Sequence, residues 1–148
     1  MSVIRYYDSS AILPLYYNET FSKKAQAALA RDFDQFVTSE LTIVELRSAL
    51  ARLERSSKIS KARATLIFEQ IERDLQSTPR KLDVSGDVLR ETLRLFASIN
   101  LPVKALDAIH LASCLRYGTK GFVTGDKQQA RLASTLGLST QWLGGKLE

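Results

Sequence analysis

Short apolar runs and longer amphipathic segments alternate along the chain, without an internal repeat or a low-complexity stretch. The short runs are rich in strand-forming residues, whereas the longer segments have helical periodicity. Strands are predicted near residues 3–7, 35–38, 80–84, 121–124 and 140–143, with helices between them. Strands that are separated by helices imply a parallel sheet covered on both faces. The pattern therefore predicts an α/β fold.

Serine residues mark the predicted starts of several helices, because a serine side chain can accept a hydrogen bond from the first helical turn. Ser39 and Ser85 each precede one helix, and Ser60 precedes another that runs to about Leu75, where Ser77, Thr78 and Pro79 break it. Gly118 is expected to end a later helix, at the position that glycine favours. The apolar positions are Leu41, Val44, Ala49 and Leu53 after Ser39, and Val88, Leu89, Leu93 and Phe96 after Ser85.

Two aspartates lie at the predicted ends of strands. Asp8 follows the run 3–7, and Asp126 follows the run 121–124 and precedes a predicted helix over residues 127–135. Ligands bind at the carboxyl ends of parallel strands, so these two acids are expected to meet in one crevice. The alternative for each is an ordinary helix N-cap, a position that aspartate favours.

Two further acids, Glu45 and Asp107, lie inside predicted helices. No basic residue stands three or four positions from Glu45, whereas Asp107 has Lys104 and His110 three positions away in an otherwise apolar helix. An ionised carboxylate in such surroundings is costly unless it is paired, protonated or bound to a cation. A solvated surface residue is the alternative for Glu45. The four acids together favour a shared divalent cation.

The residue types indicate which cation this would be. Carboxylate oxygens without a cysteine or histidine cluster favour Mg²⁺, with Mn²⁺ as a substitute. The chain has one histidine and one cysteine, and both stand in the apolar helix after Asp107. We expect His110 to support or pack rather than to ligate a metal, and Cys114 to pack.

Four stretches resemble the PIN domains, and among them the VapC-like toxins of toxin–antitoxin pairs. They are Tyr7-Asp8-Ser9-Ser10-Ala11-Ile12, Thr42-Ile43-Val44-Glu45-Leu46, Leu106-Asp107-Ala108-Ile109-His110-Leu111-Ala112 and Val123-Thr124-Gly125-Asp126. The resemblance implies a three-layer α/β/α sandwich with a mainly parallel central sheet, as one nuclease domain over residues 1–148. It also implies a metal-dependent endoribonuclease, which would form a homodimer and be inhibited by a cognate antitoxin.

The same resemblance assigns roles to residues. Asp8, Glu45 and Asp107 would be the principal metal ligands, and Asp126 would hold a second ion or position the attacking water. Ser9 and Thr124 would support these acids through hydrogen bonds.

The net charge of +5 is concentrated in residues 47–63. This stretch contains one acid, Glu54, and six basic residues: Arg47, Arg52, Arg55, Lys58, Lys61 and Arg63. Such a cluster can follow the phosphates of a nucleic acid, and we expect Arg47, Arg52, Arg55 and Lys58 to contact RNA. The alternative is a solvated helical hairpin without a ligand.

Other features limit the possible classes of protein. The N-terminus lacks a charged leader, and no apolar run approaches the roughly 20 residues that span a bilayer, so a cytoplasmic protein without a membrane segment is expected. Asp8 could instead accept a phosphate, as in receiver domains or dehalogenase-like phosphatases, although Asp8-Ser9-Ser10 lacks the second acid of the latter. A catalytically silent RNA- or protein-binding module with the same fold is the other alternative.

Overall fold

The computed structural model describes residues 3–33, 35–76 and 81–147. Its strands are β1 (Arg5–Tyr7), β2 (Phe36–Ser39), β3 (Lys81–Leu82), β4 (Gly121–Thr124) and β5 (Ser139–Trp142). They form one sheet in the order β3-β2-β1-β4-β5, and every pairing is parallel. Each predicted strand is present, and where a predicted end differs from the observed one, the difference is one or two residues. Residue 80 of the predicted third strand lies outside the described residues.

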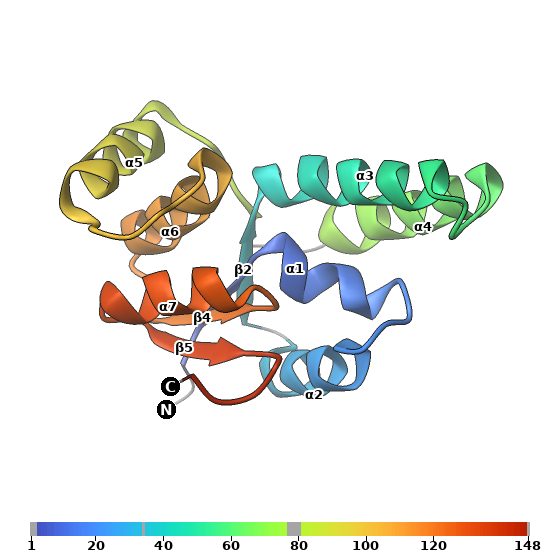
Figure 1. Cartoon of the computed structure of the whole chain (residues 1–148), viewed down its shortest axis with the longest axis horizontal. Helices are drawn as coiled ribbons and strands as arrows, with labels where there is room; N and C mark the ends of the chain where they lie inside the picture. Colours follow the sequence, from blue (N-terminus) through green and yellow to red (C-terminus); the bar gives the residue numbers. More distant parts are fainter. Residues whose placement is uncertain (1–2, 34, 77–80, 148) are drawn as a thin grey trace.

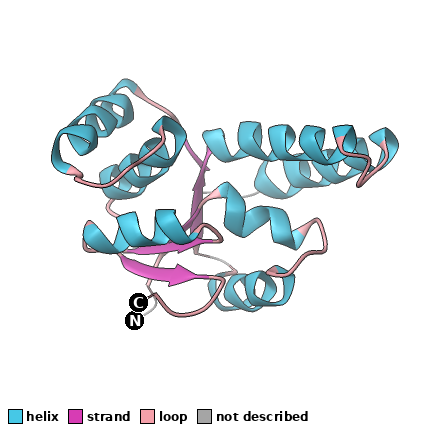
Figure 2. Cartoon of the chain, viewed as in Figure 1, coloured by secondary structure: helices cyan, strands magenta, loops and turns pink. Residues whose placement is uncertain are grey.

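Helices connect the strands (Figures 1 and 2). They are α1 (Ser9–Ile12), the 3₁₀ helix η1 (Leu13–Leu15), α2 (Ser22–Asp32), α3 (Glu40–Arg55), α4 (Lys61–Gln76), α5 (Gly86–Ser98), α6 (Ala105–Tyr117) and α7 (Lys127–Thr135). In Figure 1, α3 and α4 lie side by side as a hairpin, and α5 and α6 form a second pair. None of the helices in the described ranges is long and apolar enough to cross a membrane.

Two hydrophobic cores lie on opposite faces of the sheet. Successive side chains of a strand point to opposite faces, so Tyr7 packs with residues of α1 to α4, while Tyr6 packs with residues of α5 to α7. Val123 and Phe122 of the neighbouring strand divide between the cores in the same way. The result is the predicted three-layer α/β/α arrangement, with β1 at its centre.

The predicted helix ends are confirmed. The Ser39, Ser60 and Ser85 hydroxyl oxygens accept hydrogen bonds from backbone N–H groups in the first turns of α3, α4 and α5, at 3.1, 3.0 and 3.3 Å. Gly118 ends α6 in the left-handed conformation, with a φ of 83° that is unfavourable for residues other than glycine. The predicted helix breakers Ser77, Thr78 and Pro79 lie outside the described residues.

The predicted apolar faces of α3 and α5 are partly wrong. Val44 is 65% exposed, and α3 instead buries Thr42, Leu46 and Leu50, which are spaced four residues apart. The Thr42 hydroxyl is hydrogen-bonded to the Thr38 hydroxyl at 2.8 Å, so this polar residue can face the core.

The same shift occurs in α5, where Val88, Thr92 and Leu95 are buried. Thr92 donates a hydrogen bond to the Val88 carbonyl at 2.8 Å and therefore takes the place of an apolar residue in the core. Leu89, Leu93 and Phe96 of the predicted face remain 46%, 69% and 44% exposed.

Candidate active site

The four predicted acids lie at the carboxyl edge of the sheet. Asp8 directly follows β1, and Asp126 follows the adjacent strand β4 by two residues. Glu45 is in the second turn of α3, the helix that follows β2, and Asp107 is in the first turn of α6. The chain continues from β1 toward β2 on one side and reaches β4 on the other, so Asp8 and Asp126 flank the point where ligands bind in α/β sheets.

Asp8 is buried and held at both carboxylate oxygens. Oδ1 accepts hydrogen bonds from the Ser10 hydroxyl at 2.6 Å and from the Ala11 N–H at 3.3 Å, and Oδ2 accepts one from the Thr124 hydroxyl at 2.7 Å. Asp8 is therefore the N-cap of α1, as its local sequence allowed. Burial raises the pKa of Asp8, although the nearby His110 and the two hydroxyls oppose this effect.

The hydroxyls that hold Asp8 also join two turns that are far apart in sequence. The Ser10 oxygen accepts a hydrogen bond from the Gly125 N–H at 2.7 Å, and the Thr124 oxygen accepts one from the Asp126 N–H at 3.0 Å. A Cβ at Gly125 would lie 2.7 Å from the Ser10 carbonyl oxygen, so the close approach requires glycine. These contacts fix Asp126 relative to Asp8.

The two predicted supporting residues differ in what they contact. Thr124 makes the expected hydrogen bond to Asp8. In the first turn of α1, the hydrogen bond to Asp8 comes from Ser10 instead of Ser9, and Ser9 lines a pocket beside Glu45. Consecutive residues of a helix point in different directions, so a serine pair in a sequence does not reveal which member faces the acid.

A buried glutamine connects Asp126 to Asp107. Asp126 caps α7 by accepting a hydrogen bond from the Gln129 N–H at 3.1 Å. The Gln129 side-chain amide, almost fully buried, donates to the Asp107 carbonyl oxygen at 2.9 Å. This bond ties the start of α7 to the first turn of α6. No local pattern indicates this hydrogen bond, because the partners are 22 residues apart.

Glu45 has a partner that its own helix does not provide. Its Oε1 contacts His110 Nε2, and His110 Nδ1 is hydrogen-bonded to the Tyr6 hydroxyl at 2.6 Å. Burial disfavours the charged imidazolium, but the hydrogen bond and charge of Glu45, together with Asp8 and Asp107, outweigh burial and raise the pKa of His110. The supporting position expected for His110 is thus observed.

The electrostatics of Asp107 indicate that the acids share one space. Burial raises the pKa of Asp107 to about 6, and the negative charges of Asp126, Asp8 and Glu45 contribute in the same direction. His110 has the opposite effect. All three other acids therefore lie close enough to repel an ionised Asp107, although they come from separate parts of the chain.

The donor chemistry of this site fits a hard divalent cation, because the carboxylates offer only oxygen ligands and a cation would relieve their repulsion. The side chains do not form a finished cage. Among the described residues, no group of three or more histidine, cysteine, aspartate or glutamate side chains is already arranged to hold a metal ion. Asp8 and Glu45 are instead oriented by neighbouring hydroxyls and an imidazole.

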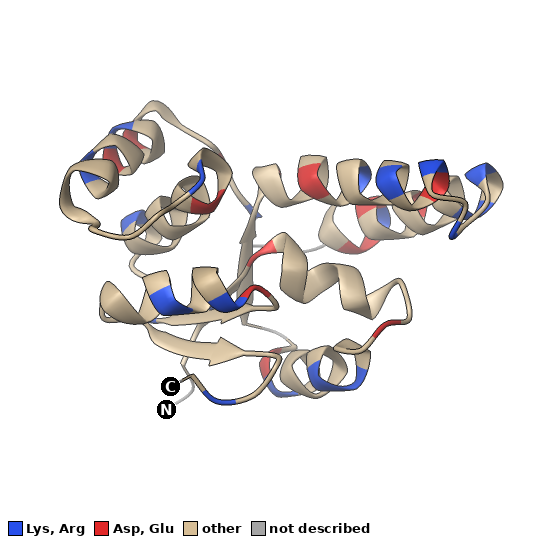
Figure 3. Cartoon of the chain, in the orientation of Figure 1, with Lys and Arg blue, Asp and Glu red and all other residues tan. Residues whose placement is uncertain are grey.

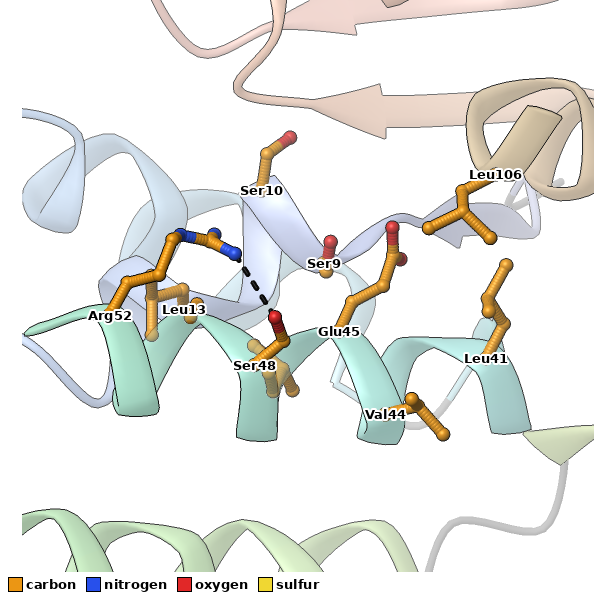
Figure 4. A pocket seen from close by; sticks show the side chains of 11 residues that line it. Ser9, Ser10, Leu13, Leu41, Val44, Glu45, Ser48, Arg52 and Leu106 are labelled. Atoms are coloured by element: carbon orange, nitrogen blue, oxygen red, sulfur yellow. Dashed lines mark hydrogen bonds between the residues drawn. The ribbon is translucent and has the colours of Figure 1, made fainter. Parts of the chain in front are cut away.

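A pocket of about 400 Å³ opens beside Glu45, between α1 and α3 (Figure 4). Its walls combine apolar side chains with the Glu45 carboxylate and the Arg52 guanidinium, which donates to the Ser48 hydroxyl at 3.1 Å. The lining residues are Ser9, Ser10, Leu13, Leu41, Val44, Glu45, Leu46, Ser48, Ala49, Arg52 and Leu106. One strongly basic side chain thus stands on the same wall as an acid of the site.

The other basic residues predicted to contact RNA lie differently. Arg47 is placed over the Phe68 ring of α4, with its guanidinium carbon 5.6 Å from the ring centroid. Arg55 ends α3, and Lys58 follows in the turn before α4. Figure 3 shows basic residues along α3 and at the tip of the α3–α4 hairpin. The hairpin therefore carries positive charge outward from the acids.

Similar folds occur in several solved structures. FitAcB from Neisseria gonorrhoeae is 15% identical, with a TM-score of 0.74 over 96% of this chain and 99% of that one. VapC20 from Mycobacterium tuberculosis, described as a sarcin-ricin loop cleaving toxin, is 16% identical, with a TM-score of 0.69 over 90% and 95%. A toxin-antitoxin complex from Klebsiella pneumoniae is 20% identical, with a TM-score of 0.59 over 86% and 89%.

The comparison with curated proteins gives no match. The family comparison matches residues 5–134 to the PIN domain. This segment includes strands β1 to β4 and the four acids Asp8, Glu45, Asp107 and Asp126. The chain belongs to the PIN domain family.

Proposed function

We propose that this protein is a divalent-metal-dependent endoribonuclease and the toxin of a toxin–antitoxin pair. The observation that carries the proposal is the placement of four acids from four segments at the carboxyl edge of the sheet, where Thr124 joins Asp8 to the Asp126 turn and Gln129 joins that turn to the Asp107 backbone. A cluster of carboxylates that repel one another is typical of a cation site, because the cation neutralises their charge. The proposal assigns residues 1–148 to one nuclease domain.

Each of the four acids has a proposed role in binding the cation or the attacking water. Asp8, Glu45 and Asp107 would hold the cation, Mg²⁺ or Mn²⁺, and Asp126 would hold a second ion or orient the attacking water. When bound, the cation supplies positive charge that activates a water and stabilises the leaving oxygen of a phosphodiester. Ser10 and Thr124 keep the Asp8 carboxylate in one orientation through their hydrogen bonds.

A nucleic acid is the substrate class that the charge distribution supports, and RNA is the choice that the family resemblance implies. An acidic site repels a polyanion, so basic side chains must bring the substrate to it. Arg52 lines the pocket beside Glu45, and Arg55 and Lys58 extend the positive charge along the hairpin. One structural relative is described as a sarcin-ricin loop cleaving toxin, which agrees with this choice.

An antitoxin and a second copy of the chain are the proposed protein partners. One structural relative is described as a toxin-antitoxin complex, which supports the first. The homodimer rests on the family resemblance, and the exposed apolar stripe of Leu89, Leu93 and Phe96 on α5 is its candidate contact. Light scattering should give twice the chain mass of 16.5 kDa; a mass of one chain at all concentrations would contradict the homodimer.

The alternative of a phosphate-accepting Asp8 has less support. Asp8 is only 4% exposed, so a phosphate donor, which is much larger than a cation, has little access to its carboxylate oxygens. A silent binding module would keep the fold and the hairpin charge but would not cleave RNA in any metal.

The test is RNA cleavage by the wild type, Asp8→Asn and the control Asp83→Asn, each in Mn²⁺ and in chelator. Asp83 is exposed, so its change to asparagine removes the same charge away from the acids. We expect cleavage by the wild type and the control only with Mn²⁺, and none by Asp8→Asn. Equal cleavage by wild type and Asp8→Asn would contradict the proposed site, and the absence of cleavage by a folded wild type would favour the binding module.

A further inference from the structure

A buried chain of hydrogen bonds runs from the centre of the sheet to Glu45. The Tyr6 hydroxyl is bonded to His110 Nδ1 at 2.6 Å, and His110 Nε2 contacts Glu45 Oε1. Tyr6 and His110 are 0% and 1% exposed, whereas the Glu45 side chain retains 19% of its accessible surface. This series of hydrogen bonds thus begins in the core and ends at the edge of the site.

The Tyr6 and His110 rings in this series of hydrogen bonds have little freedom to move. Tyr6 stacks on Phe122 of β4, with ring centroids 5.4 Å apart and planes 11° apart. It meets His110 edge to face, with centroids 5.7 Å apart. Phe122 and His110 pack against two sides of Tyr6 and fix its ring, and the hydrogen bond with the Tyr6 hydroxyl restricts rotation of the buried imidazole.

Glu45, in contrast, would be free to change rotamer without this contact. A glutamate side chain on a partly exposed helix samples several rotamers, and ordering it costs conformational entropy. The contact at Oε1 selects one rotamer, and the second carboxylate oxygen can then serve a cation or a water. Carboxylates that bind metals are commonly oriented in this way by hydrogen bonds from outside the ligand set.

We propose that Tyr6 and His110 are positioning residues, which hold the Glu45 carboxylate in the orientation that binds the divalent cation. This inference rests on the proposed function. It assigns no contact with RNA or with the cation to either residue. Their effect is exerted through Glu45 alone.

The chain offers a matched control on the same strand. Tyr7 is also fully buried, and its hydroxyl donates a hydrogen bond to Asp32 Oδ2 at 2.6 Å, the same length as the Tyr6 bond. Asp32 is paired with Arg5 and Arg31 at the end of α2, on the other face of the sheet. Tyr7→Phe therefore removes an equivalent buried hydroxyl that does not lead to the acids.

The experiment is a Mn²⁺ titration, followed by the electron paramagnetic resonance signal of the free ion. Tyr6→Phe should weaken Mn²⁺ binding by about 10-fold, the lower end of the usual effect of such partners, and Tyr7→Phe should leave the Kd unchanged. A Tyr6→Phe/His110→Leu variant removes both hydrogen-bonding side chains without leaving a buried polar group unpaired, so it is expected to fold. Its affinity for Mn²⁺ should fall by up to about 100-fold. In a Glu45→Ala background, Tyr6→Phe should cause no further loss.

The possible outcomes separate the two proposals. If the wild type binds Mn²⁺, and Tyr6→Phe and the double variant bind it with the same Kd, the positioning role is wrong and the proposed function is left intact. A loss that persists in the Glu45→Ala background would also overturn it, because the effect would not pass through Glu45. A wild type that binds no Mn²⁺ would overturn both proposals.

Discussion

At the scale of residues, the site is built from acids whose charges oppose one another. Asp107 has a pKa of about 6, raised by burial and by three neighbouring carboxylates, so its ionised form destabilises the folded protein without a cation. An acid whose folded pKa lies above its ordinary value binds its proton more tightly in the folded state. The stability of the metal-free protein should therefore fall as the pH rises from about 4 through 6.

The variant Asp107→Asn cannot ionise and should escape this loss. In chelator above pH 6, we expect it to be more stable than the wild type by about 1 to 2 kcal/mol, a value reduced for the solvent screening of a partly exposed group. For a chain of this size, the melting temperature should rise by about 2 to 8 °C. Thermal melts across pH 4 to 8 provide the measurement, and a gap that does not narrow toward pH 4 would contradict the assignment.

The acids themselves could be predicted from local sequence, whereas their partners were predicted only in part: Thr124 was expected to support them, but Ser10 and Gln129 were not. Asp8 and Asp126 follow strands, Glu45 has no basic residue three or four positions away, and Asp107 stands in an otherwise apolar helix, so the four together indicate a site. The contact of Glu45 with His110 joins residues 65 positions apart, and that of Thr124 with Asp8 joins residues 116 apart. Such contacts depend on the packed sheet, which the local pattern does not contain.

At the scale of elements, positive charge is concentrated on the α3–α4 hairpin. Arg52 faces the pocket beside Glu45, and Arg55 and Lys58 lie further along, while Arg47 packs on Phe68. The first three can follow a phosphate backbone without a change in fold. Phosphate contacts release counterions, so the affinity for RNA should depend on salt.

Replacing Arg52, Arg55 and Lys58 with alanine should flatten that dependence. At about 0.7 per phosphate contact, the slope of log affinity against log salt should decrease by up to about 2 units. The binding titration is made in chelator, so that RNA is not cleaved. Alanine at Lys23, Lys24 and Lys120, three exposed lysines on α2 and before β4, removes the same charge as a control. An equal change of slope in both triple variants would indicate a general charge effect instead of a binding surface.

The elements also show where sequence patterns lose precision. The capping serines and Gly118 located the helices well, because a cap depends on residues adjacent in sequence. The buried faces of α3 and α5 were misplaced because Thr42 and Thr92 face the core with their hydroxyls bonded. A threonine is counted as polar in the pattern, although a satisfied hydroxyl can be buried at little cost.

At the scale of the whole molecule, the parallel sheet brings the acids together. The alternation of strands and helices was sufficient to predict the three layers, and every strand pairing is parallel. The order β3-β2-β1-β4-β5 places β1 beside β4, although more than 100 residues separate them, and thereby places Asp8 near Asp126. The folded state therefore assembles the proposed cation site, and a cation that binds there must stabilise that state.

Thermal melts with and without Mn²⁺ test this linkage most directly, using the wild type, Asp107→Asn and the control Asp83→Asn at neutral pH. At a hundredfold excess over the wild-type Kd, Mn²⁺ should stabilise the wild type and the control by about 2.7 kcal/mol, or about 5 to 10 °C. Asp107→Asn, which lacks one ligand, should gain clearly less. If Mn²⁺ raises none of the melting temperatures, or raises those of the wild type and Asp107→Asn equally, the four acids do not form the proposed metal site.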